Sequence, residues 1–177
     1  LPRQSRIEGL TLDGGQPSTV AADMLVKVIG DTVTLRSCQI QNGETGVQLL
    51  SGPTGFRAEG CTVTATLVGF HLIGSGATIQ KSRVTGNTSA GIFSGGGSSH
   101  SITENVFLSN GVAIRLGGGS SNISRNKIYG STAEGIYLTN PNMIYANDII
   151  ENETGVFISS ASTSGNKVQW NNFRGNI

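Results

Sequence analysis

Three side chains near the middle of the sequence have the chemistry needed to act on an acidic sugar: Arg115, Glu134 and Tyr137. A tyrosine hydroxyl can serve as a general acid, and an arginine can neutralise the carboxylate of a uronate. A competing interpretation makes Glu134 a solvated turn acid, like Glu44 and Glu153. Whether the chain is an enzyme is left open by these residues alone.

Arg115 and Tyr137 also belong to a longer series of residues, each found between two apolar positions of a Gly-Ile-x-Leu-like segment. An apolar pair at spacing two is strand periodicity, so the residue between them faces outward. The series is Gln48, His71, Phe93, Arg115, Tyr137 and Phe157. Aromatic rings at regular spacing suit the apolar faces of sugars, and Arg or Gln can bind hydroxyls or a carboxylate. The alternative is that these aromatic side chains only pack on one another.

The elements that position this series recur at a nearly fixed interval. A Gly or Ala precedes each segment at positions 46, 69, 91, 113, 135 and 155, with intervals of 23, 22, 22, 22 and 20 residues. Short apolar runs at such a period, separated by Gly, Ser, Asn and Thr, are typical of a solenoid of strands. We therefore predict an all-β, single-stranded parallel solenoid of three short strands per coil and about 7–8 coils, with no helix. Neighbouring coils would lie ~4.8 Å apart.

Stacked coils would place equivalent residues above one another inside the solenoid. One predicted inward column contains Leu35, Ala58, Ile79, Ile102, Ile123, Ile144 and Val168, and another contains Ile40, Val63, Val84, Phe107, Ile128, Ile149 and Phe173. Between them lies a polar column of Cys38, Cys61, Ser82, Asn105, Asn126, Asn147 and Asn171. Buried amides are costly unless paired, and amides stacked at strand spacing can pair with each other. The pattern predicts an asparagine ladder.

The coils divide the sequence without a domain boundary, so residues 1–177 form one predicted domain. Residues 1–6 are a predicted lead-in, the first coil begins at Ile7, and residues 13–23 form an irregular loop. Regular coils follow at residues 31–52, 53–76, 77–99, 100–121, 122–142 and 143–165. An eighth coil at residues 166–177 lacks its last strand, which leaves an unpaired edge. We expect flanking chain segments, or another copy, to cap the ends.

The repeats resemble the right-handed parallel β-helix family, which includes pectate-lyase-like enzymes, alginate epimerases, phage tailspikes and NosD-like periplasmic proteins. The residues carrying the resemblance are Ile102-x-x-Asn105-x-Phe107, Ile123-x-x-Asn126-x-Ile128 with Gly135-Ile136-x-Leu138, and Ile144-x-x-Asn147-x-Ile149 with Gly155-Val156-x-Ile158. The resemblance implies a right-handed solenoid that binds sugar chains along an outer face. The catalytic and calcium-binding acidic clusters of its enzyme members are missing here, so it implies scaffold more than activity.

Composition limits the partners. Charged residues make up 13% of the chain and the net charge is +1, which disfavours nucleic acid. No apolar run reaches the ~18 residues of a membrane-spanning helix. Low charge and polar turns favour an extracellular, cell-surface or periplasmic location, and the missing initiator Met suggests a piece of a longer chain.

The sequence predicts neither a metal site nor a disulfide. His71 and His100 have no Cys or acid at ligand spacing and are interpreted as surface side chains, so no metal site is predicted. Asp13 and Asp23 carry oxygen ligands of the type that calcium prefers, but no dense ligand cluster surrounds them. Cys38 and Cys61 are one coil apart, and parallel side chains make a disulfide torsion awkward, so buried free thiols are predicted.

Three functions remain. The first is a polysaccharide-associated module that binds, or also processes, an acidic glycan along the face from Gln48 to Phe157. The second is a structural spacer in a larger surface, filament or phage protein. The third is an enzyme resembling polysaccharide lyases, epimerases or glycoside hydrolases, with Arg115, Tyr137 and Glu134 as its catalytic groups and no cofactor.

Overall fold

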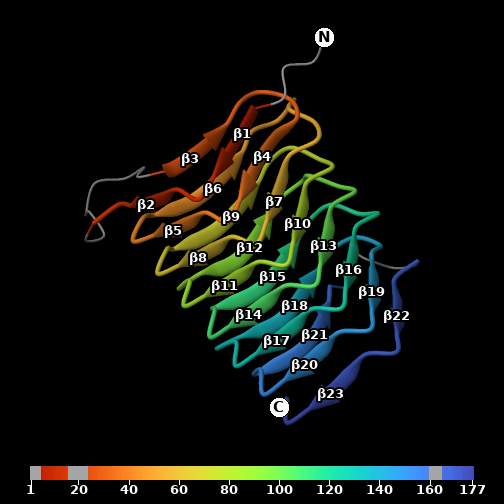
Figure 1. Ribbon diagram of the computed structural model, residues 1–177. Helices are drawn as coiled ribbons and strands as arrows, with labels where there is room; N and C mark the ends of the chain where they lie inside the picture. The colour runs from red at the N-terminus through yellow and green to blue at the C-terminus, as the bar shows by residue number, and fades with distance from the viewer. Residues whose placement is uncertain (1–4, 16–23, 160–164) are drawn as a thin grey trace.

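A computed structural model shows a parallel β-solenoid (Figure 1) and describes residues 5–15, 24–159 and 165–177. The chain turns repeatedly through three short strands, and each turn lies on the one before it. We call one such turn a rung and number the rungs from the N-terminus, so that rung 1 contains β1–β3 and rung 7 contains β19–β21. The predicted all-β solenoid with repeats near 22 residues is confirmed.

Three parallel sheets form the walls. The first sheet contains β1 (Ser5–Glu8), β4 (Val33–Arg36), β7 (Arg57–Glu59), β10 (Thr78–Gln80), β13 (Ser101–Thr103), β16 (Asn122–Ser124), β19 (Met143–Tyr145) and β22 (Lys167–Gln169). The second contains β2 (Thr11–Asp13), β5 (Gln39–Gln41), β8 (Thr62–Thr64), β11 (Arg83–Thr85), β14 (Val106–Leu108), β17 (Lys127–Tyr129), β20 (Asp148–Ile150) and β23 (Asn172–Arg174). The third contains β3 (Met24–Val28), β6 (Thr45–Leu49), β9 (Val68–Leu72), β12 (Ala90–Ser94), β15 (Val112–Leu116), β18 (Glu134–Leu138) and β21 (Thr154–Ile158).

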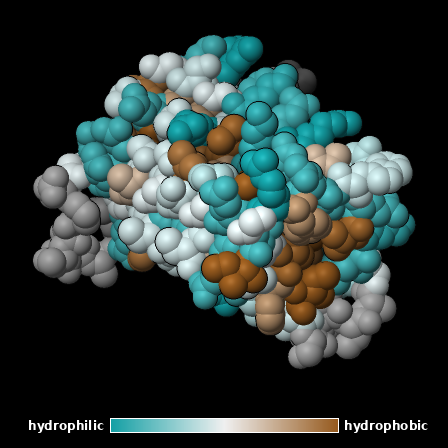
Figure 2. All heavy atoms as spheres, turned by 90° about the horizontal axis from the view of Figure 1, so that it is seen from below, coloured by the Kyte–Doolittle hydropathy of each residue, from teal (hydrophilic) through white to brown (hydrophobic). Residues whose placement is uncertain are grey.

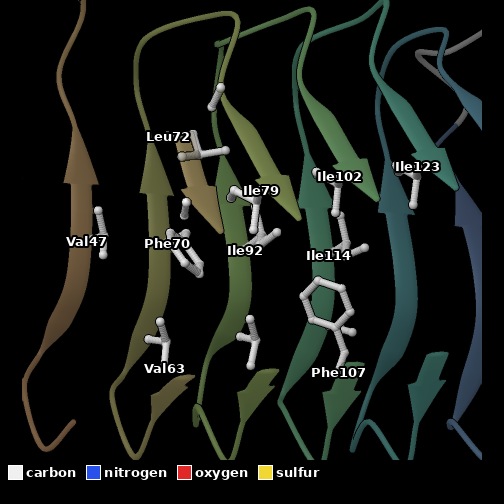
Figure 3. Packing of buried hydrophobic residues seen from close by; sticks show 14 of the residues in the cluster. Val47, Val63, Phe70, Leu72, Ile79, Ile92, Ile102, Phe107, Ile114 and Ile123 are labelled. Carbon is white, nitrogen blue, oxygen red and sulfur yellow. The ribbon is translucent and has the colours of Figure 1, made fainter. Parts of the chain in front are cut away.

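The interior between the sheets is filled by stacked apolar side chains (Figure 3). In the first sheet Ile79 pairs with Ile102 and Ile102 with Ile123, and in the second Val84 pairs with Phe107. All of these side chains are fully buried. The predicted inward columns are confirmed as far as Ile144 and Ile149, while their last members, Val168 and Phe173, are exposed at the end of the solenoid. Because like side chains meet at strand spacing, each rung buries its apolar face only when another rung lies on it.

Glycine precedes the outward series for a steric reason. A Cβ added to Gly69 would lie 2.5 Å from the carbonyl oxygen of Gly91, and one added to Gly91 would lie 2.7 Å from that of Ala113. The backbones of successive rungs approach closely here, and a side chain would force them apart. This close approach explains the most regular feature of the repeat.

The corners of the solenoid carry polar ladders, and the predicted one is confirmed at the first corner, between the first and second sheets. Asn126 donates from Nδ2 to Oδ1 of Asn147 at 2.9 Å, and its own Oδ1 accepts from Nδ2 of Asn105 at 3.0 Å. The backbone N–H of Asn105 also donates to that oxygen, at 2.9 Å. Each amide is thus paired on both sides while buried, which removes the penalty of placing it in the interior.

Two further ladders, which were not predicted from the sequence, lie at the other two corners. At the second corner, between the second and third sheets, Nδ2 of Asn87 donates to Asn110, and Nδ2 of Asn152 donates to Asn176. At the third corner, which leads to the next rung, the backbone of Ser121 donates to Asn142. The missed signal is a spacing of five residues within one rung, as in Asn142, Asn147, Asn152 and in Asn166, Asn171, Asn176.

Some boundaries differ from expectation. Ser5 and Arg6 belong to the predicted lead-in, but they already form part of strand β1 and pair with Val33 and Thr34. Most of the predicted irregular loop lies outside the described residues. The described residues contain no helix that is long and apolar enough to cross a membrane.

The face of the last rung is rich in exposed apolar groups. Figure 2, seen from below Figure 1, shows hydrophobic surface gathered on this side of the molecule. The exposed apolar residues of β21, β22 and β23 include Phe157, Ile158, Val168 and Phe173.

Candidate functional site

The predicted outward series is a continuous column on the third sheet. Gln48 pairs in register with His71, and His71 with Phe93. Phe93 pairs with Arg115, Arg115 with Tyr137, and Tyr137 with Phe157. Their strand neighbours on either side point into the core, so the alternation of the strand places this column outside. Lys27 of β3 stacks on Gln48 and extends the column by one rung that the sequence analysis did not include.

Arg115 lies at the centre of this column between two aromatic rings. Its guanidinium carbon is 4.8 Å from the centroid of the Tyr137 ring and 5.9 Å from that of Phe93. Both distances are within the range of cation–π attraction. Because rings cover the guanidinium from two sides, its N–H groups are left to bind a ligand at the edge of the column. Among the described residues Arg115 forms no ion pair.

The rings themselves pack on their neighbours. Tyr137 and Phe157 are stacked, with centroids 5.1 Å apart and planes inclined by 14°. His71 and Phe93 have centroids 5.2 Å apart and planes tilted by 42°. The faces that Tyr137 and Phe157 turn toward each other are therefore closed to a sugar. The flat stacking of a sugar on each ring of the column, which the sequence analysis expected, is not available between these two rungs.

A shallow groove of about 200 Å³ runs beside the column, where the third sheet turns into the third corner. Phe93, Arg115 and Tyr137 of the column line it together with Gly95 and Gly117, which follow β12 and β15. A Cβ on Gly117 would lie 2.2 Å from the carbonyl oxygen of Gly95, so no side chain fits at this position. Thr139 also lines the groove, and its hydroxyl donates a hydrogen bond to the carbonyl oxygen of Gly117 at 3.1 Å.

The three residues with predicted catalytic roles are only partly brought together. Arg115 and Tyr137 are in contact, as described above. Glu134 begins β18, three residues before Tyr137 in the same strand, and pairs in register with Thr154 rather than with a residue of the column. Three residues of extended strand span ~10 Å, so the backbone positions of Glu134 and Tyr137 are about that far apart.

The two histidines occupy different environments. His71 is half-buried on the column, its Nδ1 lies 3.4 Å from Nε2 of Gln48, and burial lowers its pKa. His100 was expected at the surface, but it is buried at the third corner. Its Nδ1 accepts the backbone N–H of Ala77 at 3.3 Å, and its Nε2 lies 3.3 Å from Oγ of Ser94. The surface interpretation of His100 was wrong because its turn position is a ladder position, equivalent to Ser121 and Asn142.

The cysteines are buried and free, as predicted. Sγ of Cys38 donates to the carbonyl oxygen of Arg36 at 3.4 Å, and Sγ of Cys61 donates to that of Leu35 at 3.6 Å. Burial raises the pKa of the Cys61 thiol. The thiols thus take the place of the asparagine amides at the first corner. Asp13, the described member of the suggested calcium pair, accepts hydrogen bonds from Gln41 and Asn42, while Asp23 lies outside the described residues.

The solenoid is similar to known families and structures. A family model described as periplasmic copper-binding protein (NosD) matches residues 3–177. Among solved structures, the Dettilon tailspike protein (gp208) is similar with a TM-score of 0.60 and 16% sequence identity, over 85% of this chain. The chain spans 43% of that tailspike chain, and a likeness at this identity shows the fold alone. No significant match is found among curated proteins.

Proposed function

The chain belongs to the NosD family, and from this premise we propose that it is an extracellular or periplasmic β-helix module that binds an acidic glycan along the outer face of its third sheet. The family description supports a location outside the cytoplasm, since it names the periplasm. The observation that carries the glycan proposal is Arg115, which is held between Phe93 and Tyr137 beside an open groove.

The surroundings of Arg115 favour a carboxylate as its ligand. A guanidinium presents its N–H groups in a planar fork that matches the two oxygens of a carboxylate. The ring contacts on its two sides hold the side chain in one orientation, which lowers the entropy lost when a ligand binds. Gln48 in the column and Thr139 in the groove add neutral polar groups for sugar hydroxyls. A uronate residue combines a carboxylate with hydroxyls and an apolar ring, and it suits this arrangement.

The mode of contact follows from the packing of the rings. Because Tyr137 and Phe157 stack on each other, a sugar chain would lie against the ring edges and in the groove. Phe157 belongs to the last rung of the third sheet and is 43% exposed, so it offers the most open aromatic surface of the column. The glycan would then run along the solenoid axis across several rungs.

Copper, which the family description names, is poorly matched by the donors present. Within residues 5–15, 24–159 and 165–177 no three or more His, Cys, Asp or Glu side chains are grouped to hold a metal ion. The two thiols lie in the interior and donate to backbone carbonyls, and burial raises the pKa of Cys61, whereas a metal ligand must be a thiolate. We assign no step to copper.

Titration with oligogalacturonate, a uronate oligomer, tests the proposal. Arg115→Gln should weaken binding by about tenfold or more, because a charge-assisted contact is lost. Arg57→Gln is the matched control, since it removes the same charge from the first sheet, and it should leave the affinity within about twofold. Calorimetry measures both. Equal affinities for the two variants, or no binding by the wild type, would overturn the proposal, and a blank glycan array would favour the structural spacer.

A further inference from the structure

We propose that the first corner of rungs 4–6 is a second binding surface, which takes a linear acidic polysaccharide through four cationic side chains. These residues are Lys81, Arg83, Arg125 and Lys127, and we call them the basic strip. The strip is separate from the column on the third sheet, and it does not depend on glycan binding there.

Register places the four cations in a compact strip along the solenoid axis. Arg83 pairs with Val106 and Val106 with Lys127, so the two cations that begin β11 and β17 are two rungs apart. Two rungs correspond to ~10 Å. Lys81 and Arg125 occupy the turns before these strands, which join the first sheet to the second (Figure 1). Both have positive φ, 50° and 55°, a conformation shared by the residues of this turn in the other rungs.

The charges of the strip are not neutralised by close partners. All four cations are exposed, and none forms an ion pair or a side-chain hydrogen bond within the described part of the chain. Elsewhere on the surface, by contrast, Arg36 lies 4.0 Å from Glu8 and Arg57 lies 3.4 Å from Glu59. The strip therefore keeps a local positive potential although the net charge of the chain is only +1.

One carboxylate interrupts the strip. Glu104 occupies the turn of rung 5, between Lys81 and Arg125, and also has positive φ, 58°. It offsets part of the positive potential and would repel an anionic ligand. Asp148 pairs with Lys127 in register and ends the strip on the next rung. Four cations against Glu104 and Asp148 leave a local excess of two positive charges.

The shape of the strip favours a polysaccharide over other anionic partners. A single row of rungs suits an extended chain whose charges recur along one direction. An anionic membrane would be held better if exposed apolar side chains could insert, but Val106 between the cations is half-buried. Single-stranded nucleic acid would need exposed rings for its bases, but the residues between the cations are Glu104 and Val106. The exposed ring of Tyr129, two residues after Lys127, donates its hydroxyl to the carboxylate of Glu151, whose charge repels phosphate.

Binding of dextran sulfate, measured on the Arg115→Gln background, tests the strip without a contribution from the third sheet. Arg83→Gln with Arg125→Gln should weaken binding by about tenfold, and added salt should weaken the parent protein further. The matched control is Arg36→Gln with Arg57→Gln, which changes the net charge equally and should change affinity by less than about twofold. Glu104→Gln should strengthen binding several-fold, because it removes the repulsive charge.

Other results would overturn the proposal. Equal losses in the two double variants would show a response to net charge alone, and unchanged affinity in the Glu104→Gln variant would remove the central role of the strip. Stronger binding to phosphatidylglycerol vesicles or to single-stranded DNA than to dextran sulfate would point to a different partner. Thermal melting of each variant excludes loss of fold as the cause. Failure of this test leaves the oligogalacturonate result at Arg115 unaffected.

Discussion

The polar columns at the corners and the outward column of the third sheet have the same spacing but opposite surroundings. Asn105, Asn126 and Asn147 are buried, and neighbouring rungs saturate their amides. Arg115 and Tyr137 also touch across rungs, yet they do so through ring contacts at the surface. One register thus produces both a scaffold and a surface. The difference teaches that an inward corner residue contributes mainly to stability, while an outward residue, on a sheet or at a corner, is free to contribute to binding.

The largest effect is expected from breaking the ladder at Asn126. Leucine has the same branching at Cγ, but it leaves the N–H and Nδ2 groups of Asn105 without Oδ1 of Asn126 and removes the donor to the Ile102 carbonyl. Each unpaired buried group costs about 1–3 kcal/mol, so Asn126→Leu should lower the free energy of unfolding by about 3 kcal/mol or more. Urea denaturation measures the loss.

Thr103→Leu provides the control for this substitution. Thr103 lies in β13 and is half-buried, outside the apolar core. A change at such a position usually alters the free energy of unfolding by no more than about 0.5 kcal/mol. If the two variants unfolded at the same urea concentration, the stabilising role of the inward amides would be disproved.

A second prediction uses the histidine of the third corner. Burial lowers the pKa of His100, and its Nδ1 must stay unprotonated to accept the Ala77 N–H. In the unfolded chain, the His100 imidazole binds a proton near the usual pKa of about 6.5. In the folded chain, the same imidazole is protonated only at a lower pH. Stability should fall as pH drops below about 6.5, by up to about 1.4 kcal/mol per pH unit, until the lowered folded pKa is reached.

His100→Asn separates this effect from other titrations. Asn fills the equivalent position in the rung of Asn142, where its Oδ1 accepts a backbone N–H. The variant should lose most of the acid sensitivity between pH 6.5 and pH 5, as measured by thermal melting. His71→Gln is the comparison, because burial also lowers the pKa of His71 on the half-buried outer column. A larger change in the His71→Gln variant would contradict the assignment of the sensitivity to His100.

The thiol end of the first ladder should contribute less than its amide end. Sγ of Cys61 donates at 3.6 Å to the carbonyls of Leu35 and Glu59, and a thiol is a weak donor. Cys61→Val keeps a small apolar side chain and removes the donor, so it should lower the free energy of unfolding by about 1 kcal/mol, well below the effect of Asn126→Leu. A loss equal to that of Asn126→Leu in urea denaturation would show that thiols and amides contribute alike.

The sequence predicted the buried columns of the solenoid better than the surroundings of its polar and outward side chains. The column of Ile79, Ile102 and Ile123 was predictable because a fixed period brings like residues into register. The burial of His100 was not, since histidine is common at surfaces and only its place in a ladder decides its surroundings. The stacking of Tyr137 on Phe157 was one of two interpretations left open, because spacing shows which residues are neighbours and not which ring faces stay open.

The smallest effect on stability is expected in the outward column. Tyr137→Ala removes the contacts with Arg115 and Phe157 but leaves the inward neighbours Ile136 and Leu138 in the core. A cation–π contact at an exposed site contributes about 0.5–1 kcal/mol, so the free energy of unfolding should fall by less than about 1 kcal/mol. The binding free energy for oligogalacturonate should fall by more than the free energy of unfolding, because Tyr137 also fixes the orientation of Arg115. If stability fell by about 3 kcal/mol with unchanged affinity, the outward column would be part of the scaffold, and the contrast with the corners would not hold.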